Sequence, residues 1–477
     1  MPRLVVIGID GMDPDVFEAL EARLPHLASL RQRGRFLPCP SVFPPDSIPA
    51  WVTIFTGEYP ETHGWLDNID YEDIRRGEAP DGARMLQGRT FWDRIGEAGK
   101  RVCVVNPLLA YPPWPVNGIM ASGPVFITGE AEIQPAELAG EYSLPELGGM
   151  VDLPAEDELE DMLGRSLLSI RELTAFGLEL FERERWDLFF ISYFTLDRVQ
   201  HFLWRFFDPR DPLYPGPSAL AGAIPTAYEA FDEAVGQFLE QTGPDDAVVV
   251  LSDHGHGRRP TMLLSVNEVL RQNGLLTTVE DATRRRLPVR TAVEVTKNVT
   301  IRLVARVLGE SWLYRIGRAL PKKARKALKS SSYLIDRERS LAWASNLGGG
   351  AAVGGVEIRP SLDRGSSEYR DTLARVQQSL EGARDESGRA PVRWTRANGA
   401  DSPYPDVVFA LEPDFAVGRS LFCPVIERNT RHRVVSGGHK ENGVFFAHNL
   451  GHVADEVSSI ADIQSAILSF VLGKRDT

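Results

Sequence analysis

The sequence predicts an α/β fold in which helices cover both faces of a mostly parallel central sheet. Two observations support this prediction. Short apolar runs with the length of strands, such as LVVIGI (4–9) and DAVVVLS (246–252), alternate with helical patterns along the chain. The runs are apolar throughout, which is typical of strands buried on both faces. With 477 residues, the chain could form one large α/β domain with insertions or two domains.

The elements are expected in an order that suits repeated βαβ units, with a helix between consecutive strands. In chain order they are strand 4–9, helix 14–34, helix 90–100, strand 101–106, helix 158–184, strand 186–194, helix 226–242, strand 246–252, strands within 405–411 and 443–449, and a helix near 460–473.

Residues 258–339 interrupt this alternation and differ from the rest of the chain in charge. Between Arg284 and Lys329 there are fourteen Lys or Arg and two acids, whereas the whole chain has a formal net charge of −13. Apolar residues recur there at helical spacing. The segment is expected to be an inserted basic helical subdomain, either a lid over a site or a solvated face packed on the core. An interfacial membrane helix is a third interpretation.

The remaining segments, 1–257 and 340–477, are expected to form the main α/β core. Their acidic balance argues against a general nucleic-acid binder. Cys39, Cys103 and Cys423 are far apart and form no CxxC pair, which indicates a reducing compartment. The N-terminal apolar run of six residues is too short for a signal peptide or a membrane span, so a cytoplasmic location is expected.

The stretch PPDSIPAWVTIFTGEYPETHG (44–64) contains the first candidate functional residue. Ser47 is expected to be the N-cap of a helix, Pro49 suits the first helical turn, and Gly57 suits the left-handed position that ends a helix. A hydroxyl at a helix N-terminus lies beside unpaired N–H groups, an environment that favours phosphate. An ordinary capped surface helix would have the same pattern.

Three acids stand just beyond predicted strands, namely Asp10, Asp197 and Asp253. In an open α/β sheet, ligands bind outside the carboxyl ends of the strands. A single acid at such a place is commonly a helix cap, but three at comparable strand ends indicate a shared site.

Histidines accompany these acids. His201 follows Asp197 by four residues, one helical turn, and His254 directly follows the third acid in SDHGHG. His256 lies between glycines and could be a ligand or a loop residue, and His439 lies in the glycine-rich SGGHKENG. Imidazoles and carboxylates without thiolates suit Zn²⁺ or Mn²⁺ at a catalytic site.

Together and in this order, these motifs resemble the alkaline phosphatase superfamily, and most closely its type I phosphodiesterase/nucleotide pyrophosphatase branch. The resemblance covers most of the chain and is weak over roughly 275–335. It implies an alkaline phosphatase-like fold and two divalent metal ions, with Zn²⁺ expected and Mn²⁺ as the alternative. One ion would be held by Asp197, His201 and His439, and the other by Asp10, Asp253, His254 and Ser47.

The resemblance also implies a reaction. Ser47 aligns with the nucleophile of the family, and metal coordination would activate its hydroxyl for attack on phosphorus. A covalent phosphoserine intermediate would form and then be hydrolysed. The expected activity is that of a phosphodiesterase, and the expected substrate is a small phosphate ester or a lipid headgroup. Peripheral membrane contact through the basic segment is a further expectation.

One position departs from the family pattern. Nucleotide pyrophosphatases have an Asn three residues after the nucleophile, where this chain has Ala50. A phosphomonoesterase or a phosphomutase of the same superfamily is therefore an alternative. A sulfatase would need an Arg where this chain has Trp51, a residue that is expected to pack in the core. A non-catalytic membrane- or partner-binding protein on this fold is the alternative from another class.

Overall fold

The computed structural model describes residues 2–66, 82–125, 129–148, 154–279, 332–348, 352–399, 401–430 and 432–473, together with positions 296 and 300. The chain divides into two compact units, each of which is described by itself. Unit 1 consists of Met1–Arg258 and Gly437–Thr477, and unit 2 consists of Arg259–Ser436.

Unit 1 is built around an eight-stranded mixed sheet in which the five central strands are parallel and the strands β17 and β5 run antiparallel to their neighbours. In spatial order the strands are β2 (Arg35–Pro40), β17 (Asn442–His448), β7 (Ala247–Leu251), β1 (Leu4–Ile9), β6 (Leu188–Tyr193), β3 (Val102–Val105), β4 (Gly118–Ser122) and β5 (Glu132–Gln134). The predicted α/β class with a mostly parallel sheet is confirmed.

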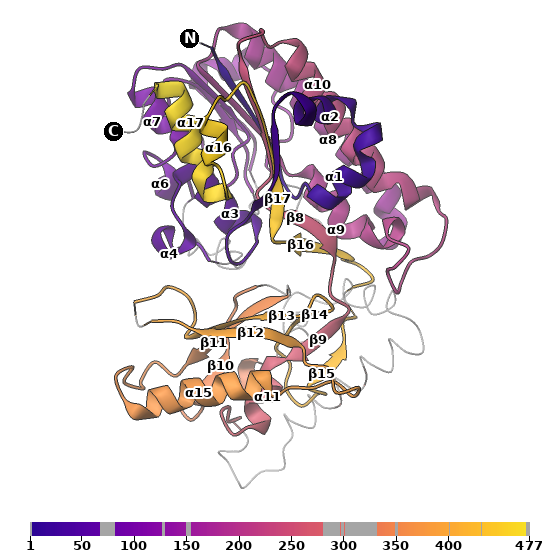
Figure 1. Cartoon of the computed structure of the whole chain (residues 1–477), viewed down its shortest axis with the longest axis vertical. Coiled ribbons are helices and arrows are strands. Elements are labelled where there is room, and N and C mark those ends of the chain that lie inside the picture. The colour runs from indigo at the N-terminus through magenta and orange to yellow at the C-terminus, as the bar shows by residue number, and fades with distance from the viewer. Residues whose placement is uncertain are drawn as a thin grey trace. The chain divides into compact units, whose positions relative to one another are not determined.

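Helices cover both faces of this sheet (Figure 1). On one face lie α3 (Ser47–Thr56), α7 (Phe91–Glu97), α16 (Val453–Glu456) and α17 (Ile463–Leu472). On the other lie α1 (Pro14–Leu20), α2 (Pro25–Arg33), α8 (Leu159–Arg183), α9 (Thr195–Phe207) and α10 (Ala223–Glu240). The short helices α4 (Pro60–His63) and α6 (Gly82–Leu86) and the 3₁₀ turns η1 (Glu21–Arg23), η2 (Ala136–Gly140), η3 (Glu156–Glu158), η4 (Ala219–Gly222) and η6 (Ile460–Asp462) complete the unit.

Strand β6 illustrates why the central strands are apolar throughout. Successive side chains of a strand point to opposite faces of the sheet. Phe190 therefore packs against Phe55 of α3, with ring centroids 5.8 Å apart, whereas its neighbour Phe189 packs against Phe181 of α8 and Phe238 of α10. Because helices cover both faces, a polar residue at either position would be buried.

Unit 2 has sheets and an apolar core of its own. One sheet is antiparallel and contains, in spatial order, β10 (Ala342–Ala344), β11 (Val353–Ile358), β13 (Val407–Leu411) and β12 (Val392–Ala397). The other contains β14 (Phe415–Gly418), β9 (Met262–Ser265) and β15 (Ile426–Arg428). The helices α11 (Val266–Gln272) and α15 (Ser367–Glu381) and the turn η5 (Ser332–Leu334) accompany them.

This division differs from the domain boundaries expected from the sequence, in which the core resumes at residue 340. The strands β10, β11 and β13 pair with one another instead of extending the central sheet, so the second unit continues to Ser436. The central sheet is regained only at β17. Most of the expected basic helical segment, 280–331, lies outside the described residues apart from positions 296 and 300.

Two further features bear on the sequence-based expectations. All three cysteines are buried and none forms a disulfide. Within the described ranges, no helix has both the length and the apolar character needed to cross a membrane.

Candidate active site

The seven residues expected to form a site come from five separate places in unit 1, and the structure brings them together. Six of them, all but Ser47, offer candidate ligand atoms that form two groups, and within each group these atoms lie within 4.8 Å of one another. The inner group consists of Asp10, Asp253 and His254, and the outer group consists of Asp197, His201 and His439.

The inner group lies at the carboxyl ends of two adjacent central strands. Asp10 directly follows β1, and Asp253 follows β7 by two residues. Gly11 connects the two ends, because its N–H donates to Asp253 Oδ1 at 3.2 Å. Its φ of +74° is a conformation that favours glycine, and a Cβ there would lie 3.0 Å from the Cβ of Asp197. The backbone thus holds the carboxylates close together.

Ser47 contacts the inner group from α3. Its Oγ lies 3.3 Å from Asp10 Oδ1 and 3.1 Å from His254 Nε2. The expectation that Ser47 is the N-cap is wrong by one residue: Asp46 is the N-cap, and its side chain accepts a hydrogen bond from the Ile48 N–H. Ser47 is the first helical residue. The helix ends, as expected, at Gly57 in the left-handed conformation with φ of +66°.

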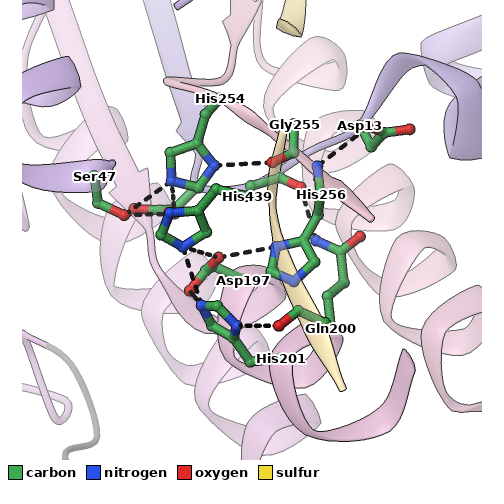
Figure 2. A network of polar contacts seen from close by, with 12 residues as sticks. Asp13, Ser47, Asp197, Gln200, His201, His254, Gly255, His256 and His439 are labelled. Atoms are coloured by element: carbon green, nitrogen blue, oxygen red, sulfur yellow. Dashed lines mark hydrogen bonds and ion pairs between the residues drawn. The ribbon is translucent and has the colours of Figure 1, made fainter. Parts of the chain in front are cut away.

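A two-stranded ribbon positions the histidines that are most distant in sequence. It consists of β8 (Gly255–Arg258) and β16 (Gly437–Lys440), which pair antiparallel with His256 opposite His439. His254 directly precedes β8, and its ring stacks on that of His439 with centroids 4.0 Å apart. The His201 ring, from α9, lies beside both His256 and His439 (Figure 2).

The three histidines of the two groups share a hydrogen-bonding pattern. Each Nδ1 faces a backbone carbonyl oxygen, which can only accept, so each Nδ1 carries the proton. The pairs are His201 with Gly437 at 3.0 Å, His254 with Gly255 at 3.0 Å, and His439 with Pro45 at 3.1 Å. In a neutral imidazole this arrangement leaves Nε2 unprotonated, with its lone pair available. Histidines that bind metal ions usually have their other ring nitrogen hydrogen-bonded in this way.

The comparisons with known proteins agree with this geometry. A sequence profile described as Type I phosphodiesterase / nucleotide pyrophosphatase matches residues 4–328, which is more than half of the chain. The protein belongs to this phosphodiesterase family. It is therefore a hydrolase that acts on phosphoric esters, and the resemblance inferred from the motifs is confirmed.

Solved structures show the fold of this phosphodiesterase-family protein. Phosphonoacetate hydrolase from Sinorhizobium meliloti 1021 is similar over 98% of this chain and 96% of its own, with a TM-score of 0.53 and 18% identity. Human ectonucleotide pyrophosphatase/phosphodiesterase 5 aligns with 94% of this chain and 87% of its own, at a TM-score of 0.47 and 12% identity. The first of these likenesses shows the alkaline phosphatase-like fold.

Electrostatics distinguish the two groups of this phosphodiesterase-family protein. In the inner group, burial is the main cause that raises the pKa of both carboxyls, and each is raised further by the negative charge of Asp197. The pKa of Asp10 is raised well above its usual range and that of Asp253 to about 8, although the Gly11 N–H partly offsets the latter. Without a cation, these carboxyls resist ionisation.

The outer group has the opposite balance. Burial alone would raise the pKa of Asp197, but the imidazoles of His201, His256 and His439 hold it well below its usual range. Burial alone would lower the pKa of His439, yet its hydrogen bond and attraction to Asp197 raise it to about 9. His439 Nε2 lies 3.0 Å from His201 Nε2. A proton on His439 Nε2 therefore lies between these two nitrogens and prevents repulsion between their lone pairs.

Each group could hold a metal ion, and the donor atoms fit one. Asp253 Oδ2 is buried and receives no hydrogen bond from any described residue. Buried carboxylates that lack compensation are costly, whereas a divalent cation neutralises them and takes bare imidazole nitrogens as ligands. The arrangement of two carboxylates with one imidazole, beside one carboxylate with two imidazoles, is suited to two neighbouring cations.

Two residues at the site go beyond the sequence-based expectations. Trp51 is fully buried, as expected of a core residue, but its indole N–H also donates to Asp10 Oδ2 at 2.9 Å. His256, which the sequence left open, is buried in β8 with Nδ1 at 3.1 Å from Asp197 Oδ1 (Figure 2). The position of Trp51 one helical turn after Ser47 was a signal for the first, and the place of His256 in SDHGHG, two residues after His254, was the signal for the second.

Proposed function

We propose that this protein is a phosphodiesterase that uses two divalent cations, with Zn²⁺ preferred and Mn²⁺ as the alternative, and Ser47 as its nucleophile. The observation that carries the proposal is the convergence of the inner and outer groups beside a single hydroxyl. The inner group contacts Ser47 directly, and the Nδ1 atoms of the three histidines face backbone carbonyls, so each Nε2 can serve as a ligand, that of His439 after it loses its proton. Each group would hold one ion.

The residues of the chain have separate tasks in this mechanism. Bound cations would supply Lewis-acid stabilisation of the phosphoryl oxygens and activate the serine hydroxyl. Ser47 Oγ would attack phosphorus, the alcohol would leave, and a phosphoserine would remain until water hydrolysed it. Asp10 and His254 hold Ser47 Oγ at 3.3 and 3.1 Å, which orients the hydroxyl at the start of α3. The N-terminal end of a helix favours the negative charge of the phosphate.

The substrate that we propose is a small phosphate ester. The solved phosphonoacetate hydrolase is a complex with phosphonoacetate, itself a small phosphorus-containing acid. Ala50 is fully buried and has no polar side chain, so any donor to the phosphoryl oxygens has to come from elsewhere. A lipid headgroup with peripheral membrane contact, and a cytoplasmic location, remain proposals of the sequence analysis.

The test combines metal analysis with a matched pair of serine variants. We expect about two transition-metal ions per chain in the wild type, as a two-metal site requires. Ser47→Ala should abolish turnover of an aryl phosphodiester without lowering the melting temperature. Ser166→Ala is the control, because it removes the same hydroxyl at a fully buried position on α8 where that hydroxyl has no partner among the described residues.

The outcomes separate the proposal from its alternatives. Retained turnover in Ser47→Ala would exclude Ser47 as the nucleophile, and the absence of both metal and metal-stimulated activity would exclude the two-metal mechanism. Two parallel assays distinguish the phosphodiesterase from its alternatives. Hydrolysis of an aryl phosphomonoester tests for a phosphomonoesterase, and isomerisation of a phosphosugar tests for a phosphomutase.

A further inference from the structure

Helix α3 contacts both oxygens of the Asp10 carboxylate through two side chains one turn apart. The Ser47 hydroxyl lies 3.3 Å from Oδ1, and the Trp51 indole N–H donates to Oδ2 at 2.9 Å. The indole nitrogen is a donor only, so its single hydrogen bond is committed to Asp10. The same helix that carries the proposed nucleophile therefore also holds a candidate ligand.

The Trp51 ring is fixed by close packing. It is fully buried and lies against Gly8 of β1, where an added Cβ would approach the ring atom Cη2 to 2.5 Å. Phe55 and Phe194 flank it, with ring centroids at 5.6 and 6.3 Å. A ring held on three sides cannot change rotamer without displacing the core, so the direction of its N–H is set by the fold.

We infer that Trp51 is a positioning residue of the inner group, an inference that rests on the proposed metal function. By binding Oδ2, the indole leaves Oδ1 as the oxygen that Asp10 presents both to a cation and to Ser47. Asp10 would then bind an ion through one oxygen only. Outer partners that orient a ligand in this way commonly change metal affinity by about 10–100-fold when they are removed.

The experiment compares Trp51→Phe with Trp92→Phe. Both residues are fully buried in the same apolar core, and both substitutions shrink an indole to a phenyl ring. They differ in one respect, because Trp92 Nε1 has no hydrogen-bond partner among the described residues. Loss of packing is therefore common to both variants, and loss of a hydrogen bond to a candidate ligand is specific to Trp51→Phe.

The readout is Zn²⁺ affinity, measured by competition with a chromophoric chelator, together with the absorption spectrum of the Co²⁺-substituted protein. We expect Trp51→Phe to bind one of two ions about 10–100-fold more weakly, and to alter the Co²⁺ spectrum. Trp92→Phe should match the wild type in both. Equal affinities and spectra in the two variants would overturn the positioning role, whereas a wild type that binds no metal would overturn the proposed function itself.

A second measurement applies if Trp51→Phe shows no cooperative unfolding transition. Wild-type protein labelled with ¹⁵N-tryptophan should then show one slowly exchanging indole N–H signal that shifts when Zn²⁺ is added. The signal that is missing from Trp92→Phe should stay in place. If no indole signal shifts although Zn²⁺ binds, the inference is wrong.

Discussion

The inner and outer groups differ in burial, in charge and in the elements that carry them. The inner ligands follow central strands and are almost fully buried, with Asp253 and His254 at 0% exposure and Asp10 at 2%. The outer ligands lie on a helix and on the β8–β16 ribbon. Their side chains are 15–23% exposed. The inner group has two carboxylates, and the outer group has two imidazoles.

This difference shows that the two groups balance their charges in different ways when no cation is bound. The inner carboxyls are crowded and buried, so they hold protons until a cation replaces them. The outer carboxylate is already ionised, and His439 balances its charge. We therefore expect the inner group to depend on its ion for charge compensation more strongly than the outer group does.

The largest expected effect comes from the inner group. Asp253→Asn should remove one ion and lower kcat/KM by about 1000-fold, since a metal contributes several kcal/mol to the transition state. In the metal-free protein at pH 9, the same change should raise the melting temperature, because it removes a buried charge. Calorimetry and metal analysis provide the measurements. Exposed Asp245→Asn is the control, and two retained ions with full activity would contradict the expectation.

A smaller loss is expected from the outer group. His439→Ala should lower kcat/KM by about 100-fold and leave one ion bound, because the inner ligands are untouched. Metal analysis after extensive dialysis measures the remaining ion. Exposed His452→Ala should behave as the wild type. Loss of both ions in His439→Ala would show that the two groups are not separable.

The pH dependence of metal binding sharpens the comparison. The metal-free protein holds a proton on Asp253 below about pH 8 and on His439 below about pH 9, and each competes with a cation. Zn²⁺ affinity should therefore rise from pH 7 to pH 9, by up to about tenfold per pH unit for each proton displaced. Chelator competition in buffers of matched ionic strength measures it. A flat profile over this window would contradict the assigned protonation.

The smallest effect is expected at His256, whose Nδ1 lies 3.1 Å from Asp197 Oδ1 and whose ring lies beside that of His201, so that its contacts are with the outer group. His256→Phe keeps a ring beside Trp204 but removes the nitrogen that faces Asp197 Oδ1. Affinity for the outer ion should fall by about tenfold and inner-ion affinity should not change. A loss confined to the inner ion would contradict the assignment of His256 to the outer group.

The sequence was sufficient for five strands of the central sheet and for the residues that gather at its carboxyl edge, whereas the shorter or more peripheral strands β2, β4 and β5 were not predicted. Strands buried on both faces have an unbroken apolar pattern, and ligand residues in such sheets follow the strand ends. Asp10 and Asp253 could therefore be placed from β1 and β7 alone. The spacing of one helical turn brought Asp197 and His201 together, but their convergence with His439 could be expected only from the combined order of the motifs.

Other features had no adequate local signal. The strands GHGR and GGHK of the ribbon are short, polar and rich in glycine, so periodicity could not reveal their pairing. Strand β13 has the apolar pattern of a central strand, but that pattern does not specify which sheet the strand joins. Asp46 and Ser47 are both residue types that favour the N-cap position. For this reason the N-cap of α3 was predicted at Ser47, one residue after its actual position at Asp46.

The ribbon has a consequence for how such an enzyme can diversify. Unit 1 breaks off after Arg258 and resumes at Gly437, and these two residues are paired across β8 and β16. The intervening unit is therefore spliced into the position of a hairpin turn, where its two ends meet, a situation in which whole-domain insertion is well tolerated. Evolution could exchange that module, or a protein engineer could graft another, with the histidine-bearing strands left joined.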